Sequence, residues 1–302
     1  MRPDAATALA YHNRHSSTPA SSHARSSLTG QQIRAEHPAG GALRANPAHL
    51  TLDAAAPMMR VMYRPSAIRR FDLPPGRIVA GKYQIERPLG SGWEGEVYAI
   101  VERSTGIRRA AKFYYPHRDP MGKAAISYAR KLDALRHCPI LLQYHHQEIA
   151  QIKRKKVTIV VSELVDGNKL SEFLAEQPGG RLSTFEALHV LYVLARGIAP
   201  IHARGEYHGD IHDDNIMIRR QGIGFEVKLI DFFDLGRPTR SKIHKDVLNL
   251  IQVFHTIVGG RDHYAQQPKV VKDIIRGQKD SLILARFQSA GDIQRHLETL
   301  QW

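Results

Sequence analysis

Between residues 82 and 162, apolar and polar residues alternate with the period of two that is typical of β-strands. Five such runs cover residues 82–89, 96–101, 109–114, 144–152 and 157–162. Four apolar residues between positions 123 and 136 recur instead at helical spacing, namely Ile126, Ala129, Leu132 and Leu135. The pattern therefore predicts a small antiparallel sheet accompanied by one helix.

The period becomes helical after residue 166. Helices are predicted at residues 170–176, 183–204, 245–258, 270–275 and 293–300. Ser183 and Glu186 have the spacing of a capping box, which marks the start of the longest helix. Two short strands, with a polar loop at residues 208–215 between them, complete this part. A β-rich lobe at about residues 81–163 and an α-rich lobe at about 166–302 predict a two-lobe α+β fold.

The first 75 residues differ in composition from the rest of the chain. They are rich in Ala, Ser, Pro and Arg, contain few acids and show no sustained hydrophobic period. Such a segment buries too little apolar surface to offset its chain entropy, so we predict a disordered extension at 1–75 and a folded domain at 76–302. The composition also resembles a targeting or secretion leader. A plain extension is the simpler interpretation, and Met58, Met59 and Met62 offer internal start sites.

Overall composition narrows the class of protein. The chain has 302 residues, and its hydrophobic content of 42% supports a packed core. The best candidate for a membrane span, Val190 to Ile201, is interrupted by Arg196 and falls short of the ~20 residues required, so no span is predicted. A single cysteine, Cys138, excludes an internal disulfide and favours a cytoplasmic location. The net charge is +14, but dispersed basic residues without interleaved aromatic residues make nucleic-acid binding unexpected.

The polar loop carries the strongest chemical signal. Residues 208–215 read His-Gly-Asp-Ile-His-Asp-Asp-Asn, and Asp231 follows after a short apolar run. Asp210 can accept a proton from an attacking hydroxyl group, while Asn215 and Asp231 offer the oxygen ligands that Mg²⁺ prefers. Taken alone, the histidines and acids also fit an iron or zinc site, or a solvated loop.

A glycine-rich turn precedes this loop. Gly90, Ser91, Gly92 and Gly95, followed by Val97, match the pattern G-x-G-x-x-G-x-V. The pattern leads into a strand, whereas a dinucleotide-binding fold requires a helix at this place. Glycines at a hairpin tip allow backbone N–H groups to approach phosphate groups closely, although an ordinary turn has the same composition.

The order of these motifs resembles the protein-kinase-like superfamily over about residues 82–258. This resemblance implies ATP and Mg²⁺, with Lys112 on the third strand holding the phosphates. Asp210 would orient or deprotonate the acceptor hydroxyl, and Asn215 and Asp231 would hold the metal. The same resemblance implies a nucleotide site formed by Gly90, Ser91, Gly92, Gly95, Val97 and Ala110, the backbone of Glu163 and Val165, and Met217 beneath the adenine ring.

Four features depart from the resemblance. The helix at 123–136 contains no glutamate to pair with Lys112, and Tyr128 stands near the matching position. Either Lys112 is unpaired and poorly oriented, or another acid replaces the missing one. Phe233 stands where a glycine should follow Asp-Phe, and His212 stands where protein-serine kinases have lysine. The segment up to Asp246, an aspartate expected to open a helix and brace the loop, is short and lacks A-P-E.

Three functions remain open at this point. The first is a divergent serine/threonine protein kinase, favoured by the complete glycine-rich loop. The second is a small-molecule kinase of the aminoglycoside or choline phosphotransferase type, favoured by His212 and the short segment. The third is a nucleotide-binding pseudokinase, favoured by Tyr128 and Phe233. The expected partners are therefore ATP and a protein or small-molecule hydroxyl acceptor.

Overall fold

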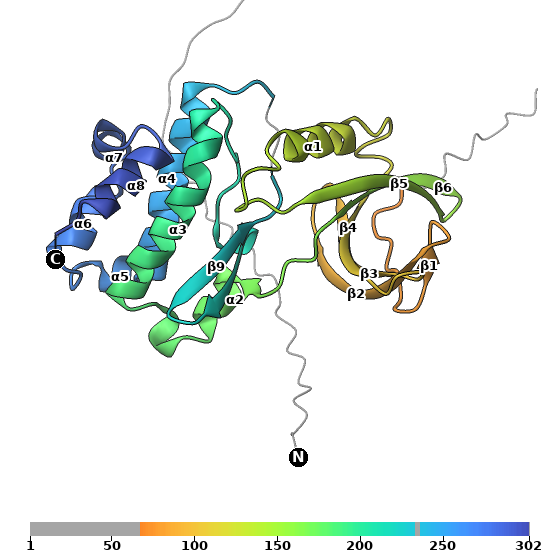
Figure 1. Cartoon of the computed structure of the whole chain (residues 1–302), viewed down its shortest axis with the longest axis horizontal. Helices are drawn as coiled ribbons and strands as arrows, with labels where there is room; N and C mark the ends of the chain where they lie inside the picture. The colour runs from red at the N-terminus through yellow and green to blue at the C-terminus, as the bar shows by residue number, and fades with distance from the viewer. Residues whose placement is uncertain (1–66, 233–235, 302) are drawn as a thin grey trace, which may run out of the picture. The chain divides into compact units, whose positions relative to one another are not determined.

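The computed structural model describes residues 67–232 and 236–301, and these form a β-rich and a helical lobe (Figure 1). The N-lobe sheet is antiparallel, with strand order β1-β2-β3-β4-β6-β5. Its strands are β1 (Ile78–Val79), β2 (Tyr83–Ser91), β3 (Gly95–Glu102), β4 (Arg108–Tyr114), β5 (Tyr144–Ile152) and β6 (Lys155–Ser162). One helix, α1 (Lys123–Ala134), accompanies them. The predicted sheet with a single helix is confirmed.

Aromatic and β-branched side chains hold the sheet together, since these residue types fit a pleated, half-buried surface. Tyr83, Tyr98 and Phe113 come from three neighbouring strands and are almost fully buried in one cluster. The helix differs from its prediction in one respect. Ile126 is 37% exposed, while Tyr128 faces the protein interior instead. A spacing of three or four positions identifies a helix but leaves the direction of its buried face undecided when apolar residues surround it.

The helical lobe is built around α3 (Thr184–Ala203), which packs against α4 (Arg240–Ile257) and α8 (Ala290–Glu298). The other helices are α2 (Leu170–Ala175), α5 (Gly260–Tyr264), α6 (Lys269–Ile275) and α7 (Asp280–Arg286), with a small sheet of β7 (Asn168–Lys169), β8 (Ile216–Gln221) and β9 (Gly224–Leu229). Among the described residues, α3 alone is long and apolar enough to cross a membrane. Its buried residues contribute to the core of this lobe, as expected for the central helix of a folded domain.

Capping explains the helix starts. The predicted capping box of Ser183 and Glu186 is present at the start of α3. In contrast, α4 begins at Arg240, five residues before its predicted start at 245, because the Thr239 side chain accepts a hydrogen bond from the Lys242 amide. Asp246 therefore lies inside α4 and does not open it. The sequence pattern predicts neither α5 nor α7. The prediction of one short strand on each side of the polar loop is wrong, because β8 and β9 both follow the loop.

The chain is packed against the N-lobe before residue 76, so the predicted boundary at 75 is too late. Ile68, Phe71 and Leu73 are buried in the same cluster as the sheet aromatics. The carboxylate of Glu96 accepts the amide N–H of Phe71 at 2.8 Å and that of Asp72 at 3.3 Å. Residues 67–73 thus form a strap over the sheet, while residues 1–66 of the predicted extension lie outside the described part of the chain.

Glu96 holds this strap as a buried carboxylate. It also accepts hydrogen bonds from the hydroxyl groups of Tyr98 and Tyr115. Burial by itself raises the pKa of Glu96, but the hydrogen bonds from Tyr98, the strap amides and Tyr115 outweigh burial and lower the pKa below its ordinary value. The carboxylate is therefore ionised at neutral pH and satisfies the amide N–H groups of Phe71 and Asp72.

We expect Phe71→Ala to destabilise the fold by about 3 kcal/mol, because it removes a ring that is 1% exposed and leaves a cavity. In a thermal melt this corresponds to a loss of roughly 6–10 °C. Phe185→Ala is the matched control, since that ring is 64% exposed. An equal, small loss in both variants would show that the strap contributes little to the fold.

Candidate functional site

The polar loop is fixed in place by a buried carboxylate on α4. Asp246 is completely buried and accepts the amide N–H of His208 at 2.6 Å and that of Gly209 at 2.9 Å. His202 on α3 lies 3.3 Å from the same carboxylate through Nε2, and its Nδ1 accepts the amide N–H of Ala290 on α8 at 2.9 Å. An Nδ1 that accepts places the proton on Nε2, which therefore donates to Asp246. Three helices thus position the loop.

Asp210 and Asn215, two residues of the polar loop, lie together. The side-chain amide of Asn215 donates to the Asp210 carboxylate and to the Asp210 carbonyl, each at 3.0 Å. The carbonyl of Asn215 in turn accepts the amide N–H of Ile230, next to Asp231. Since the amide nitrogen of Asn215 is used for Asp210, its side-chain oxygen is the atom left for a cation. The pairing holds Asp210 while keeping about half of its carboxylate accessible.

Asp231 has a strained backbone. Its φ is +51°, in the left-handed region that aspartate tolerates better than most residues, and such conformations concentrate at functional sites. Its carboxylate lies 3.3 Å from the ammonium of Lys112. This contact joins β4 of the N-lobe to the segment that follows β9 in the helical lobe. The third residue of the Asp-Phe-Phe sequence, Phe233, lies outside the described residues.

Lys112 is not left unpaired. Its side chain is 16% exposed, and its ammonium contacts Glu94 of the glycine-rich loop at 2.8 Å in addition to Asp231. The rings of Tyr114 and Tyr128 lie 5.4 and 5.3 Å from the same ammonium, within cation–π range. Burial tends to lower the pKa of Lys112, but Asp231 and Glu94 raise it above its usual value. The lysine is therefore a permanent cation.

Tyr128 occupies the place predicted from the sequence, on the face of α1 that meets Lys112. Burial raises the pKa of its phenol well above the usual range, so this group is neutral. The only acid of α1, Asp133, is 61% exposed and pairs with Arg136. The alternative of a substitute acid is thus the one observed, and the substitute comes from a loop rather than from the helix.

A second lysine fixes α1 against the polar loop. The ammonium of Lys131 lies 3.9 Å from the ring of Tyr207 and 4.2 Å from that of Phe232, and it is 3.6 Å from the Glu206 carboxylate. Phe232 also packs against the His208 ring, at 5.0 Å between centroids. Burial lowers the pKa of His208 to about 4, so this imidazole is neutral. Residues on both sides of Asp210 and Asp231 therefore share one rigid cluster.

The glycine-rich loop has the space that a phosphate cradle needs. A Cβ built on Gly90 or Gly92 would meet no atom within 4 Å. The opposite holds for Gly95, where a Cβ would lie 1.9 Å from the carbonyl oxygen of Phe113, so any side chain would separate β3 from β4. The first two glycines and Ser91 are exposed. The loop can thus bring its backbone close to a ligand, as the sequence predicts.

The residues predicted to bind adenine are half-buried. Val97 pairs with Lys112 across β3 and β4, and Ala110 pairs with Ser162 at the end of β6. Val165 follows β6 in the linker between the lobes, and Met217 lies on β8 in the helical lobe. Partial exposure of apolar side chains at the linker is what a flat apolar ligand requires.

The backbone N–H and the side chain of Glu163 are both bound within the protein, whereas the sequence predicts that the backbone of Glu163 binds adenine. The amide N–H of Glu163 donates to the Gln143 carbonyl at 2.9 Å, so this N–H is already used. Its own carbonyl accepts from the Ser162 hydroxyl at 3.5 Å and keeps a second lone pair for a ligand. Its carboxylate accepts from the Gln143 amide and pairs with Lys228 at 2.7 Å. The side chain therefore ties the linker to β9.

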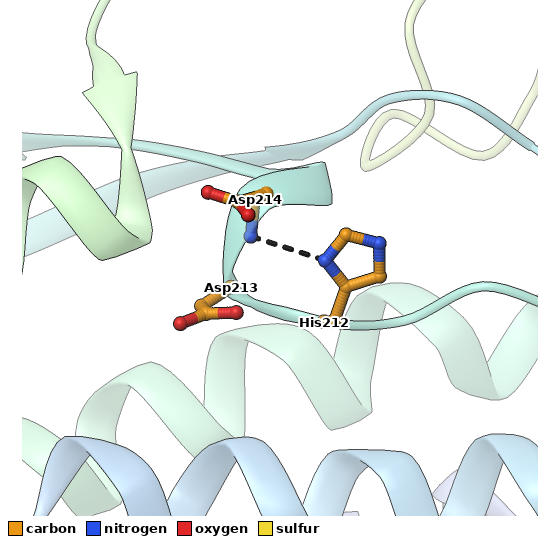
Figure 2. Close-up of side chains that lie close together, drawn as sticks. All are labelled: His212, Asp213 and Asp214. Carbon is orange, nitrogen blue, oxygen red and sulfur yellow. Dashed lines mark hydrogen bonds between the residues drawn. The ribbon is translucent and has the colours of Figure 1, made fainter. Parts of the chain in front are cut away.

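His212 lies beside Asp210, with Nε2 3.6 Å from an Asp210 carboxylate oxygen. Figure 2 shows its ring directed toward Asp214, whose amide N–H donates to Nδ1 at 3.3 Å. Asp213 lies close by, and one ligand atom from each of the three residues falls within 4.8 Å of the others. The contact caps a short 3₁₀ turn, Asp213–Asn215, and this structural role accounts for the cluster.

The comparison with known families decides the identity of this site. The protein kinase domain matches residues 83–272, which is more than half of the chain. The chain belongs to the protein kinase family. The matched segment begins in β2 and ends in α6, so it contains Glu94, Lys112, Asp210 and Asp231.

Curated relatives support a kinase enzyme. Serine/threonine-protein kinase pkn2 of Myxococcus xanthus is 30% identical over 163 residues, which cover 53% of this chain and 19% of that protein. Death-associated protein kinase 2 of Homo sapiens is 30% identical over 155 residues, covering 50% of this chain and 40% of that protein. The chain thus spans less than half the length of these relatives, so the similarity concerns their kinase portion.

Solved structures support the fold. The kinase domain of Mycobacterium tuberculosis PknI, in a double-mutant form, gives a TM-score of 0.52 at 20% identity and covers 75% of this chain and 96% of that one. Rad53 in complex with AMP-PNP gives a TM-score of 0.55 at 19% identity and covers 72% and 61%. At these identities the likeness shows the two-lobe kinase fold alone.

Glu94 and Lys131 are the site residues that the sequence prediction missed. A carboxylate inside a glycine-rich phosphate loop is itself a signal, because it would repel phosphate unless a cation lay beside it. Lys131 has no such signal, since a lysine on an amphipathic helix is expected to face solvent. Its contacts with Tyr207 and Phe232 arise only when α1 meets the helical lobe.

We expect Asp246→Asn to lower both stability and activity. The substitution places an N–H₂ group against loop amides that need an acceptor, which costs about 2 kcal/mol or more for a buried, charge-assisted network. Thermal melts and phosphate-transfer rates would be compared with those of Asp133→Asn, which changes an exposed aspartate. An unchanged melting temperature in Asp246→Asn would contradict the bracing role.

Proposed function

We propose that this kinase transfers the γ-phosphate of ATP, with Mg²⁺, to a serine or threonine hydroxyl of a protein. The observation that carries the proposal is the joined set of Lys112, Asp231, Asn215 and Asp210. Lys112 contacts Asp231 at 3.3 Å, and Asn215 contacts Asp210 at 3.0 Å. One cation and two accessible carboxylates are therefore held in fixed positions beside a glycine-rich loop.

Each residue has a role that its chemistry supports. Lys112 would contact the α- and β-phosphates as a permanent cation, and the backbone of Gly90 to Gly92 would cover them. Asp210 would accept a hydrogen bond from the acceptor hydroxyl and orient it for attack. Most of the rate enhancement would come from positioning and charge neutralisation rather than from covalent chemistry.

The donor set also fits a magnesium ion. Asp231 offers a carboxylate and Asn215 a side-chain oxygen, and these hard oxygen donors are the ones that Mg²⁺ selects. When bound, Mg²⁺ neutralises the charge on the phosphate oxygens. The carboxylate of Asp231 would supply the negative charge that attracts the ion, and the left-handed backbone conformation of Asp231 sets the direction of this carboxylate.

We expect Asp210→Asn to abolish most phosphate transfer while leaving the fold intact. The loss should be at least about 10²-fold, because an amide cannot accept the hydroxyl proton. The melting temperature should stay close to wild type, since the carboxylate is nearly half exposed and Asn keeps an acceptor for Asn215. The measurement is transfer of labelled phosphate from ATP to a generic protein substrate; retained turnover would remove Asp210 from catalysis. Transfer to an aminoglycoside or choline, with none to protein, would favour the small-molecule alternative.

We expect Asp231→Asn to weaken Mg²⁺-dependent ATP binding roughly tenfold or more, because it removes the charged metal ligand. Thermal-shift titrations with ATP, in the presence and absence of Mg²⁺, report this affinity as ligand-dependent stabilisation. The Mg²⁺-dependent part of the shift should disappear in the variant. An unchanged Mg²⁺ effect would place the metal elsewhere.

A further inference from the structure

We propose that Glu94 is the positioning residue for Lys112, and that the glycine-rich loop, rather than α1, supplies the carboxylate that completes the phosphate site. The inference rests on the proposed function, because it assigns Lys112 to ATP phosphates. It goes further by naming the carboxylate that orients the lysine and the element that delivers it. The consequence is a site whose assembly depends on the loop that covers the nucleotide.

The first argument is that α1 supplies no charge at this place. Tyr128 is buried at the position that faces Lys112, and its neutral phenol offers a ring face rather than an anion. Asp133 points to solvent, where it pairs with Arg136. A buried ammonium requires a paired anion, since its desolvation is otherwise costly. The partner must therefore come from outside α1.

The second argument is that Asp231 cannot serve as that partner during the reaction. As a metal ligand, Asp231 would direct its charge toward Mg²⁺. Glu94 is then the carboxylate that remains on Lys112, at 2.8 Å and closer than Asp231 in the structure. An ammonium has three N–H groups, so a bond to Glu94 leaves donors for phosphate oxygens.

The third argument is that the backbone of Glu94 is fixed although it belongs to a loop. Its carbonyl accepts the amide N–H of Tyr115 at 2.8 Å, and the Gly92 amide donates to the Gly95 carbonyl at 2.8 Å. The neighbouring Trp93 ring lies 4.1 Å from the guanidinium of Arg118. The carboxylate is thus presented by a defined turn between β2 and β3, which is hydrogen-bonded to the residue that follows β4.

The fourth argument concerns α1, which is held without any contribution from the Lys112 pair. Lys131 anchors it to Tyr207, Phe232 and Glu206, as described above. The anchor of α1 is therefore separate from the Glu94–Lys112 ion pair, although the Tyr128 ring also touches Lys112. Removing the Glu94 carboxylate should leave the Lys131 anchor of α1 intact, which makes the inference testable.

The test compares Glu94→Gln with wild type and with the control Glu86→Gln. Glu86 forms an exposed pair with Arg108 in the same sheet, at 2.6 Å. In Glu94→Gln we expect kcat/KM for ATP to fall by about 10- to 100-fold, because Lys112 loses its orientation. The dissociation constant for Mg²⁺-ATP should rise as well. Glu86→Gln should keep the wild-type values, and melting temperatures of all variants are measured to verify folding.

A second-site variant distinguishes positioning from a general structural role. Adding Tyr128→Glu to Glu94→Gln places a carboxylate on α1 next to Lys112, and we expect it to restore at least about tenfold of the lost kcat/KM. Unchanged kinetics and affinity in Glu94→Gln would overturn the inference. So would tighter ATP binding, because Glu94 would then be a group that competes with phosphate.

The two proposals fail in different ways. If wild type binds Mg²⁺-ATP but transfers no phosphate, the proposed function is wrong, and weaker binding in Glu94→Gln still supports the positioning role. If wild type transfers phosphate and Glu94→Gln does so equally well, only the inference is wrong. If wild type does not bind Mg²⁺-ATP at all, both are wrong.

Discussion

The site depends on the ion pairs of the Lys112 ammonium, because its pair with Asp231 connects the N-lobe to the helical lobe. Lys112 lies on β4 in the N-lobe, contacts Asp231 beyond β9, and receives Glu94 from the glycine-rich loop. Two carboxylates and two aromatic rings surround a single cation in a nearly buried position. At low local dielectric such contacts are strong and a missing partner is costly, so the positions of the glycine-rich loop, β4 and the segment after β9 are linked.

Two separate sets of contacts orient the lysine and hold the helix. Glu94 accompanies Lys112, whereas Lys131 binds α1 to the rings of Tyr207 and Phe232. The neutral His208 packs on Phe232, and the Asp246 carboxylate accepts hydrogen bonds from the amides of His208 and Gly209. Because the rings and the Asp246 carboxylate are closely packed, the helix and the loop form one assembly.

The strap at residues 67–73 is also held by a buried carboxylate, that of Glu96, and it packs against the N-lobe sheet. Glu96 follows the last glycine of the loop and binds the strap amides, while Phe71 fills the aromatic cluster. The sheet next to the phosphate loop is thereby stiffened by a segment that precedes the matched kinase domain. This packing is a physical reason to treat residues 67–82 as part of the domain.

The sequence by itself determined the two-lobe class, the strands and helix of the N-lobe, the polar motif at residues 208–215 and the position of Tyr128. These features depend on local periods and short spacings, which the backbone geometry imposes on neighbouring residues. The start of α4 was misplaced because the Thr239 cap outweighs a weak apolar pattern. Only the tertiary structure decided that Glu94 pairs with Lys112, 18 positions away, and that Phe71 binds Glu96, 25 positions away. Such pairs form when strands and loops fold over one another, and side-chain contacts between separate elements leave no period in the sequence.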